Sequence, residues 1–361
     1  MLLDLWLTKG SRKTGFEHTG NSLKILNWLL SIASFLATFP INANGFLEKA
    51  QLKTQIVSSD NLSKYQVDAE YNKRIIDSYC SKLSHYFKTY GWEKKPCSGV
   101  DWKAKYKTLG GYPLLYASFG SGEYTTLILS GVHPDEYTPI PMGFRFARYL
   151  AKEGGKFKNS RIIIAPLVNP DGFIRQNPTR TNANGIDPNR NFFTEDWHPK
   201  AIAWWKGGKN RAKRHFPGYL PNSEIETLFQ IELLDRFKPD KIISIHAPLG
   251  FLDYDGPGDR KPKNLSETER DAKNLAQTMA KKSSNYRLVD YSFYPGSLGN
   301  FAGAERHIPT ITLELETTQP KLVNKYWKQF LPALIHSVEY PYKNKEESLK
   351  NKPIFSKLLS K

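Results

Sequence analysis

A histidine and a glutamate stand three positions apart directly after an apolar segment of the chain. His133 and Glu136 lie in the stretch GVHPDEYTPI, which follows the strand-like run YTTLILS at residues 124–130. Loops that leave strands often carry function, and two metal-binding residue types at this spacing can turn toward one point. Because His-x-x-Glu also arises by chance, a site here needs a third ligand, a base and groups that bind a substrate.

Two further candidates lie at the carboxyl ends of strand-like runs. His246 follows the run KIISI, residues 241–245, and Glu314 belongs to the run TITLEL, residues 310–315. Open α/β sheets place their sites at the carboxyl ends of strands. Taken alone, His246 is more typical of a hydrogen-bonded structural histidine. Glu314 is flanked by leucines, and a buried carboxylate is costly unless it is paired, hydrogen-bonded or near a metal.

A long segment between these runs, residues 169–222, is rich in Asn, Pro, Gly and Arg. Loops of this length inside a compact domain are usually functional or disordered. Arg175, Arg180 and the pair Asn189-Arg190 could grip a carboxylate through forked hydrogen bonds. The alternative is that they are surface arginines on a basic protein.

Alternating strand-like and helix-like runs from about residue 113 predict the fold. They indicate an α/β protein, a three-layer α/β/α sandwich around a mixed, mostly parallel sheet. Ser223 with Glu226 and Ser266 with Glu269 form capping boxes that should open two helices. The predicted strands are residues 113–119, 125–130, 161–167, 241–245 and 310–315, and the predicted helices lie within residues 75–92, 140–153, 223–237, 266–282 and 321–331.

The N-terminal 43 residues have the order of a secretory signal. Basic residues up to Lys24 precede an apolar run at residues 25–39, and small residues surround Ala43. The run is short for a membrane-spanning helix, although an uncleaved anchor and a buried helix are alternatives. We therefore expect a signal peptide at 1–43, a small N-terminal segment at 44–112, the main domain at 113–345 and a basic tail at 346–361.

If the protein is exported, this affects whether the two cysteines pair and which partners the positive charge would meet. Cys80 and Cys97 could pair in an oxidising compartment or remain free thiols, and two cysteines without C-x-x-C spacing are too few for a zinc site. The net charge of +17 favours polyanionic partners, and an exported protein meets anionic cell-wall polymers and lipid headgroups rather than nucleic acid.

Two polar stretches are more typical of solvated loops than of binding elements. WWKGGKNRAKRHF, residues 204–216, has no helical periodicity, and a basic loop is favoured over an insertion that faces the substrate. FLDYDGPGD, residues 251–259, contains Asp253, Asp255 and Asp259 and is rich in turn residues. One of these aspartates could instead meet an ammonium group.

These motifs together resemble the zinc metallocarboxypeptidases, the funnelin family. The resemblance rests on the turn from His133 to Glu136, NPDG at 169–172, RTNANG at 180–185, DPNRNF at 187–192, His246 after SI and Glu314 after TL. The six motifs stand in the family's order and cover roughly residues 113–340. The stretch YPGSLGNFAG, residues 294–303, is similar to the bacterial branch that trims peptidoglycan peptides.

The resemblance implies a metallopeptidase with one Zn²⁺ per chain. His133, Glu136 and His246 would hold the ion and leave one position open. Glu314 would be the general base.

The resemblance also assigns roles in substrate binding. Arg180 would face the developing oxyanion, with Arg175 as its rival, and Asn189 and Arg190 would bind the terminal carboxylate of the substrate. Tyr291 fits the family's mobile tyrosine, with Tyr294 as the alternative. Leu298 would line the base of the side-chain pocket, where an apolar residue gives no support to selection of lysine or arginine.

The implied activity is that of an exported exopeptidase, periplasmic or associated with the cell wall. It would cleave peptidoglycan stem peptides, either at the bond from D-glutamate to diaminopimelate or at a neighbouring DL- or LD-carboxypeptidase bond. We expect a monomer that meets the membrane only through its signal and binds no nucleic acid. The alternatives are a carboxypeptidase for ordinary peptides, a related acyl-amino-acid deacylase and a non-catalytic cell-wall-binding protein.

Overall fold

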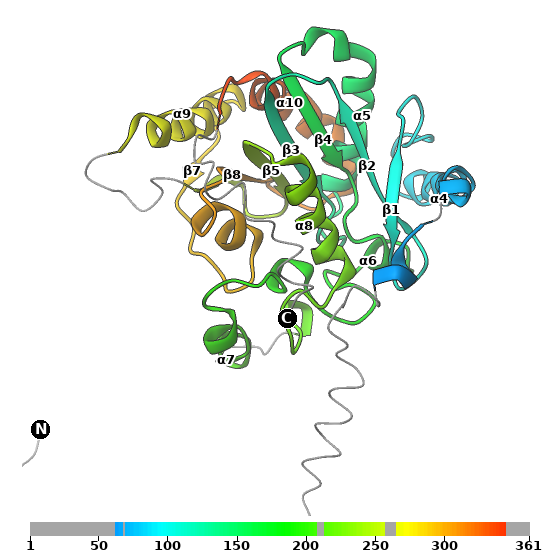
Figure 1. Cartoon of the computed structure of the whole chain (residues 1–361). Coiled ribbons are helices and arrows are strands. Elements are labelled where there is room, and N and C mark those ends of the chain that lie inside the picture. The colour runs from blue at the N-terminus through cyan, green and yellow to red at the C-terminus, as the bar shows by residue number, and fades with distance from the viewer. Residues whose placement is uncertain (1–61, 68, 208–212, 257–264, 344–361) are drawn as a thin grey trace, which may run out of the picture. The chain divides into compact units, whose positions relative to one another are not determined.

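The computed structural model describes residues 62–67, 69–207, 213–256 and 265–343. The predicted signal peptide and basic tail lie outside these residues. Within them the chain forms one mixed sheet of eight strands in the order β1-β2-β4-β3-β5-β8-β6-β7 (Figure 1). The strands are β1 Lys103–Lys107, β2 Pro113–Phe119, β3 Tyr124–Ser130, β4 Ser160–Ala165, β5 Lys241–His246, β6 Phe251–Asp255, β7 Leu288–Val289 and β8 Thr310–Glu314.

The centre of the sheet is parallel. Strand β3 pairs in parallel with β4 and β5, and β5 pairs in parallel with β8. Antiparallel pairing occurs between β1 and β2, between β2 and β4, and between β6 and β8. Strands β3 and β5 are buried over almost their whole length, as expected for parallel strands that are covered on both faces. The predicted α/β architecture is therefore confirmed.

Helices cover both faces of the sheet (Figure 1). The core on one face is built from residues of α4, α5, α9 and α10, and the core on the other face contains residues of α8. Apolar side chains on both faces of the sheet thus pack the strands between two layers of helices. The helices are α4 Ala69–Thr89, α5 Pro139–Glu153, α6 Pro170–Phe173, α7 Ile202–Gly207, α8 Ile225–Phe237, α9 Glu267–Lys282 and α10 Val323–Glu339.

One of the two predicted capping boxes is wrong. Ser266 and Glu269 form the box at the start of α9, but α8 begins at Ile225, after Glu224, without a side-chain cap. The hydroxyl of Ser223 donates to Glu224, and the carboxylate of Glu226 accepts from Asn182. The side chains that a capping box would need are therefore used in other hydrogen bonds.

The prediction of solvated loops is wrong for described parts of both polar stretches, which contain regular secondary structure. Residues 251–255 form the buried strand β6, so Asp253 and Asp255 are 7% and 6% exposed. The pairing of β6 with β8 overrides its turn-like composition. Part of the basic stretch forms α7, and residues 208–212 lie outside the described residues.

Cys80 and Cys97 form a disulfide that joins α4 to the loop before β1. The alternative of two free thiols is therefore wrong.

None of the helices in the described ranges is long and apolar enough to cross a membrane.

Candidate active site

The order of the central strands brings the predicted residues together. Strands β3, β5 and β8 are neighbours and run in the same direction, so their carboxyl ends lie at one edge of the sheet. His133 follows β3, His246 ends β5 and Glu314 ends β8. His246 and Glu314 are direct partners in the register of β5 and β8. The parallel topology therefore gathers residues that are far apart in the sequence.

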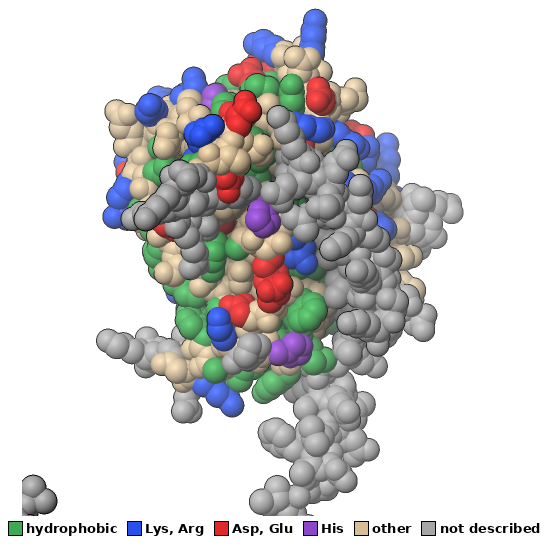
Figure 2. Space-filling view, turned by 60° about the vertical axis from the view of Figure 1, so that its left-hand side comes forward, with side chains coloured by type: hydrophobic (Ala, Val, Ile, Leu, Met, Phe, Trp, Pro, Cys, Tyr) green, Lys and Arg blue, Asp and Glu red, His purple; other side chains and the backbone are tan. Residues whose placement is uncertain are grey.

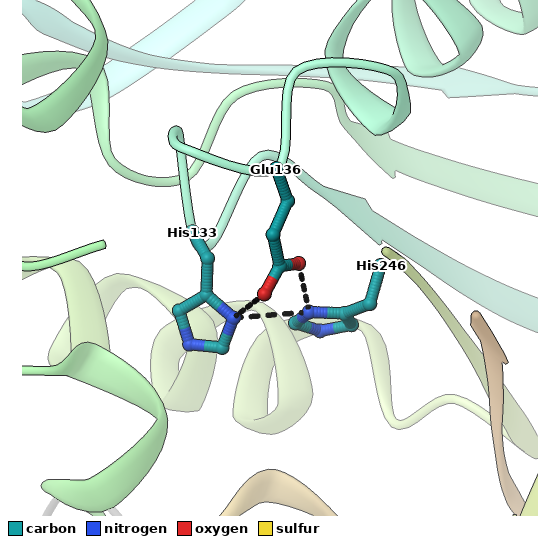
Figure 3. Close-up of side chains that lie close together, drawn as sticks. All are labelled: His133, Glu136 and His246. Atoms are coloured by element: carbon teal, nitrogen blue, oxygen red, sulfur yellow. Dashed lines mark hydrogen bonds and ion pairs between the residues drawn. The ribbon is translucent and has the colours of Figure 1, made fainter. Parts of the chain in front are cut away.

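His133, Glu136 and His246 converge on one point (Figure 3). The Nδ1 atoms of the two histidines are 3.1 Å apart. Oε1 of Glu136 lies 3.0 Å from Nδ1 of His133, and Oε2 lies 2.9 Å from Nδ1 of His246. All three side chains are buried. Three lone-pair donors from two segments of the chain thus face the same small volume.

The second ring nitrogen, Nε2, of each of these histidines has a polar partner. Neither partner was assigned a role from the sequence. Nε2 of His133 lies 3.0 Å from Oδ1 of Asp187, and Nε2 of His246 lies 2.9 Å from the hydroxyl of Ser244. If each Nε2 carries the proton, both Nδ1 atoms are free to bind a metal. The signals were present in the sequence: Ser244 precedes His246 by two on a strand, and Asp187 opens the DPNRNF motif.

These three side chains suit zinc. Two imidazole nitrogens and one carboxylate oxygen form a donor set typical of catalytic zinc sites, which keep a further position open. Burial alone would raise the pKa of Glu136, but the neighbouring His133 and His246 outweigh burial and hold it well below its ordinary value. The carboxylate is therefore ionised and ready to bind a cation. Among the described residues, His133, Glu136 and His246 are the group that could hold a metal ion, and they are called the metal-binding cluster below.

Glu314 lines the same cavity as the three converging residues. Its side chain is 9% exposed, and Oε2 accepts a hydrogen bond from the backbone N–H of Leu249 at 3.3 Å. Burial, and then the charge of Glu136, raise the pKa of Glu314 to about 7. A carboxyl group with this pKa can both accept and return a proton near neutral pH.

The two candidate arginines occupy different environments. Arg180 is buried, and it donates from Nε to Asp187 at 2.7 Å and from Nη1 to Glu136 at 3.0 Å. Arg175 is exposed and donates to the hydroxyl of Thr179. Arg180 lines the cavity of the metal-binding cluster, and Arg175 is not among the lining residues.

Asn189 and Arg190 line the same cavity. Arg190 is buried, its guanidinium lies 4.4 Å from the ring centre of Tyr294, and its Nε has no hydrogen-bond partner among the described residues. Burial lowers the pKa of Arg190 to about 10, so it stays charged at neutral pH. A charged guanidinium in the wall of the cavity is suited to an incoming carboxylate.

The remaining predicted residues also reach the cavity. Tyr291 is 40% exposed, and its hydroxyl accepts a hydrogen bond from Tyr294 at 3.2 Å, so both tyrosines are close to the site. Leu298 is buried and donates its backbone N–H to Oδ1 of Asn189 at 2.7 Å. The cavity measures about 280 Å³, which is room for the terminal part of a small peptide.

The basic stretch contributes side chains to this region. Arg214 and His215 line the cavity, and Nη2 of Arg214 lies 2.7 Å from Oδ2 of Asp135, which directly precedes Glu136. Figure 2 shows acidic, basic and histidine side chains close together on one face of the molecule. Burial lowers the pKa of His215 to about 4, so this histidine is neutral at pH 7. Arg214 and His215 therefore border the site, and the prediction that the stretch stands apart in solvent is wrong for these residues.

Comparisons with known proteins agree with this geometry. The model of the zinc carboxypeptidase family matches residues 97–332. Murein peptide amidase A of Vibrio campbellii is 32% identical over 237 residues, which cover 64% of this chain and 86% of that protein. Murein peptide amidase A of Escherichia coli K12 is 30% identical over 150 residues, which cover 41% and 59%. The structure of bovine thrombin-activatable fibrinolysis inhibitor aligns with a TM-score of 0.54 at 17% identity over 73% of this chain and 95% of that one, which shows a shared fold.

Proposed function

The chain belongs to the zinc carboxypeptidase family, and on that premise we propose that it is an exported exopeptidase for peptidoglycan stem peptides. The convergence of His133, Glu136 and His246 in one cavity with Glu314 carries the proposal. The similarity to murein peptide amidase A of Vibrio campbellii supports the choice of substrate. The bond cleaved would be that from D-glutamate to diaminopimelate, or a neighbouring carboxypeptidase bond.

His133 and His246, through Nδ1, and Glu136 would hold the zinc ion. Zinc held there would supply a Lewis acid that makes water nucleophilic near neutral pH. Asp187 and Ser244 would fix the orientation and the tautomer of the two imidazoles.

Glu314 would take a proton from the attacking water and pass it to the departing amine. Burial raises the pKa of Glu314 above that of an ordinary carboxyl group, which suits a group that must both take up and release a proton. Arg180 would offer its guanidinium to the negative charge that develops on the carbonyl oxygen. Its hydrogen bonds to Asp187 and Glu136 hold the guanidinium in a fixed orientation beside the metal-binding side chains.

Arg190 and Asn189 would bind the terminal carboxylate of the substrate, which makes the reaction exopeptidic. The charged guanidinium of Arg190 in the cavity wall supports this role. Tyr291 would lie over the bound substrate, and Leu298 would line the base of the side-chain pocket; both side chains border the cavity.

Two features support export. Residues 1–43 have the pattern of a secretory signal, and the described part of the chain contains the disulfide between Cys80 and Cys97, a bond that forms mainly in oxidising compartments. The domain bounds are predictions: they divide the chain after the signal into the segment 44–112, the catalytic domain 113–345 and the basic tail 346–361. Strand β1 of the first segment pairs with β2 in the sheet, and helix α4 of the same segment contacts β1 and β2.

The direct test is to incubate the zinc-loaded protein with purified muropeptides, with and without a zinc chelator, and to identify products by mass spectrometry. We expect loss of a terminal diaminopimelate or D-alanine that stops when zinc is removed. Hydrolysis of ordinary peptides alone would replace the proposed substrate with that alternative. If protein shown to hold zinc hydrolyses neither class of peptide, the alternative of a non-catalytic cell-wall-binding protein replaces the proposal.

A further inference from the structure

A second cavity adjoins the site of the metal-binding cluster. It is lined by Asp135, Arg180, Trp205 and Arg214, among other residues. Arg180 and Arg214 also line the first cavity, so the two cavities share a wall. Apart from Arg180, none of the residues that line the second cavity has a role in the proposed mechanism.

The direction of a bound peptide follows from the positions of Arg190 and Arg180. Arg190, the expected partner of the terminal carboxylate, lines the first cavity but not the second. Arg180, which would face the scissile carbonyl, lines both. A substrate that extends from Arg190 past Arg180 therefore places the residue on the amino side of the scissile bond toward the second cavity.

The chemistry of this cavity suits a carboxylate on a short aliphatic arm. Trp205, Phe216 and Tyr219 give it an aromatic wall, with ring centres 4.8 Å apart for the first pair and 5.1 Å for the second. Lys213 and Arg214 add positive charge. The methylene groups of a ligand can pack on the rings while its acidic end meets the cations.

Arg214 is the cation best placed to bind such a group. Its side chain is 53% exposed and pairs with Asp135, which is 25% exposed. An ion pair this open to solvent contributes little free energy and can rearrange at little cost. A guanidinium has several N–H donors, so one bond to Asp135 leaves others for a second carboxylate.

We propose that Arg214 binds a carboxylate carried by the substrate residue on the amino side of the scissile bond. The inference deepens the proposed function and rests on it. It makes the basic stretch a determinant of specificity: an acidic residue before the scissile bond is favoured, and a cationic one is disfavoured by like charge.

The test uses binding, so that it does not depend on turnover. The zinc-loaded Glu314→Gln variant is titrated in a calorimeter with two matched stem tripeptides that end in diaminopimelate. One has the α-carboxylate of its γ-linked D-glutamate free, and in the other this carboxylate is amidated. We expect the free acid to bind more tightly, and Arg214→Gln in the same background to weaken its binding about 10-fold to 100-fold, as for a lost charged hydrogen bond.

Arg214→Gln should weaken binding of the amidated ligand by less than about threefold, because this ligand has no charge for Arg214 to bind. Arg236→Gln is the matched control, since Arg236 contacts Tyr116 and Glu232 and lines neither cavity. Equal weakening of both ligands by Arg214→Gln, no preference for the free acid, or no binding of either ligand overturns the inference. Failure of the parent protein to cleave any muropeptide would instead count against the proposed function.

Discussion

His133 and Asp187 form a buried hydrogen bond between Nε2 and Oδ1 at 3.0 Å. The other oxygen of Asp187 accepts from Arg180 at 2.7 Å. Asp187 therefore links an imidazole expected to bind zinc with the guanidinium expected to bind the oxyanion. Burial alone would raise the pKa of Asp187, but Arg180 and His133 outweigh it and hold the pKa well below its ordinary value.

Asp187→Asn should weaken zinc binding. An asparagine cannot place a negative charge on both partners, and loss of such an outer partner typically lowers metal affinity about 10-fold to 100-fold. The measurement is the zinc dissociation constant from competition with a chelator. Asp101→Asn, at a side chain that is 91% exposed, is the control and should leave the constant unchanged. An unchanged constant in Asp187→Asn would show that Asp187 does not support the metal site.

Glu314→Gln should abolish most of the activity and retain zinc. A glutamine cannot accept the proton, and loss of a general base costs about 10²-fold to 10⁴-fold in rate. The measurements are kcat on the peptide that the parent cleaves and the zinc content by atomic absorption. Glu316→Gln, two residues further and paired with Lys325 at the surface, is the matched control. A Glu314→Gln variant that cleaves as well as the parent would contradict the mechanism.

Arg180→Lys should lower kcat/KM about 10²-fold to 10³-fold, the usual effect of removing a donor to an oxyanion. A lysine keeps the charge but cannot reproduce the forked contacts to Asp187 and Glu136. Arg175→Lys is the control, because Arg175 is exposed and contacts Thr179. A larger loss in Arg175→Lys than in Arg180→Lys would reverse the assignment. Zinc content should be measured for both variants.

Replacing both Cys80 and Cys97 by serine should lower the free energy of unfolding by about 3 kcal/mol, because the unfolded chain regains the freedom of the closed loop. The disulfide lies outside the cavity of the metal-binding cluster, so kcat should change little. Urea unfolding, with and without reductant, checks the prediction. If reductant lowers the stability of the parent and not that of the double variant, the disulfide is the cause.

Glu226 should make stability depend on pH. Burial, and then the charge of Glu224, raise the pKa of Glu226 from its ordinary 4.5 to about 8. Between these values the folded protein holds the proton and the unfolded protein releases it. The stabilising contribution is therefore complete below pH 4.5 and is lost as the pH rises to about 8.

Glu226→Gln should remove this dependence, at most about 1.4 kcal/mol of unfolding free energy per pH unit. The amide oxygen can still accept from Asn182 as the carboxylate does. Urea unfolding of parent and variant from pH 5 to pH 8 measures the difference. Glu123→Gln, at an exposed side chain, is the control, and its unfolding free energy should change with pH as steeply as that of the parent. Parallel slopes for the parent and Glu226→Gln would contradict the assignment of the proton to Glu226.

The sequence by itself determined the sheet centre, the family and the residues that converge. Apolar runs define β3, β5 and β8, and His133, His246 and Glu314 stand at or just after their ends. Such patterns are local: a buried strand needs a continuous apolar run, and a polar residue at its end is visible without knowledge of the fold. Parallel topology then implies that these ends meet.

Only the tertiary structure decided the contacts that depend on neighbours distant in sequence. Asp253 and Asp255 look like loop residues until pairing with β8 buries them. Asp187 reaches His133 across 54 positions, and Arg214 reaches Asp135 across 79. A hydrogen bond or ion pair of this kind depends on where two side chains are placed by separate elements. The local sequence of neither partner carries that information, because packing of the whole domain sets the distance between them.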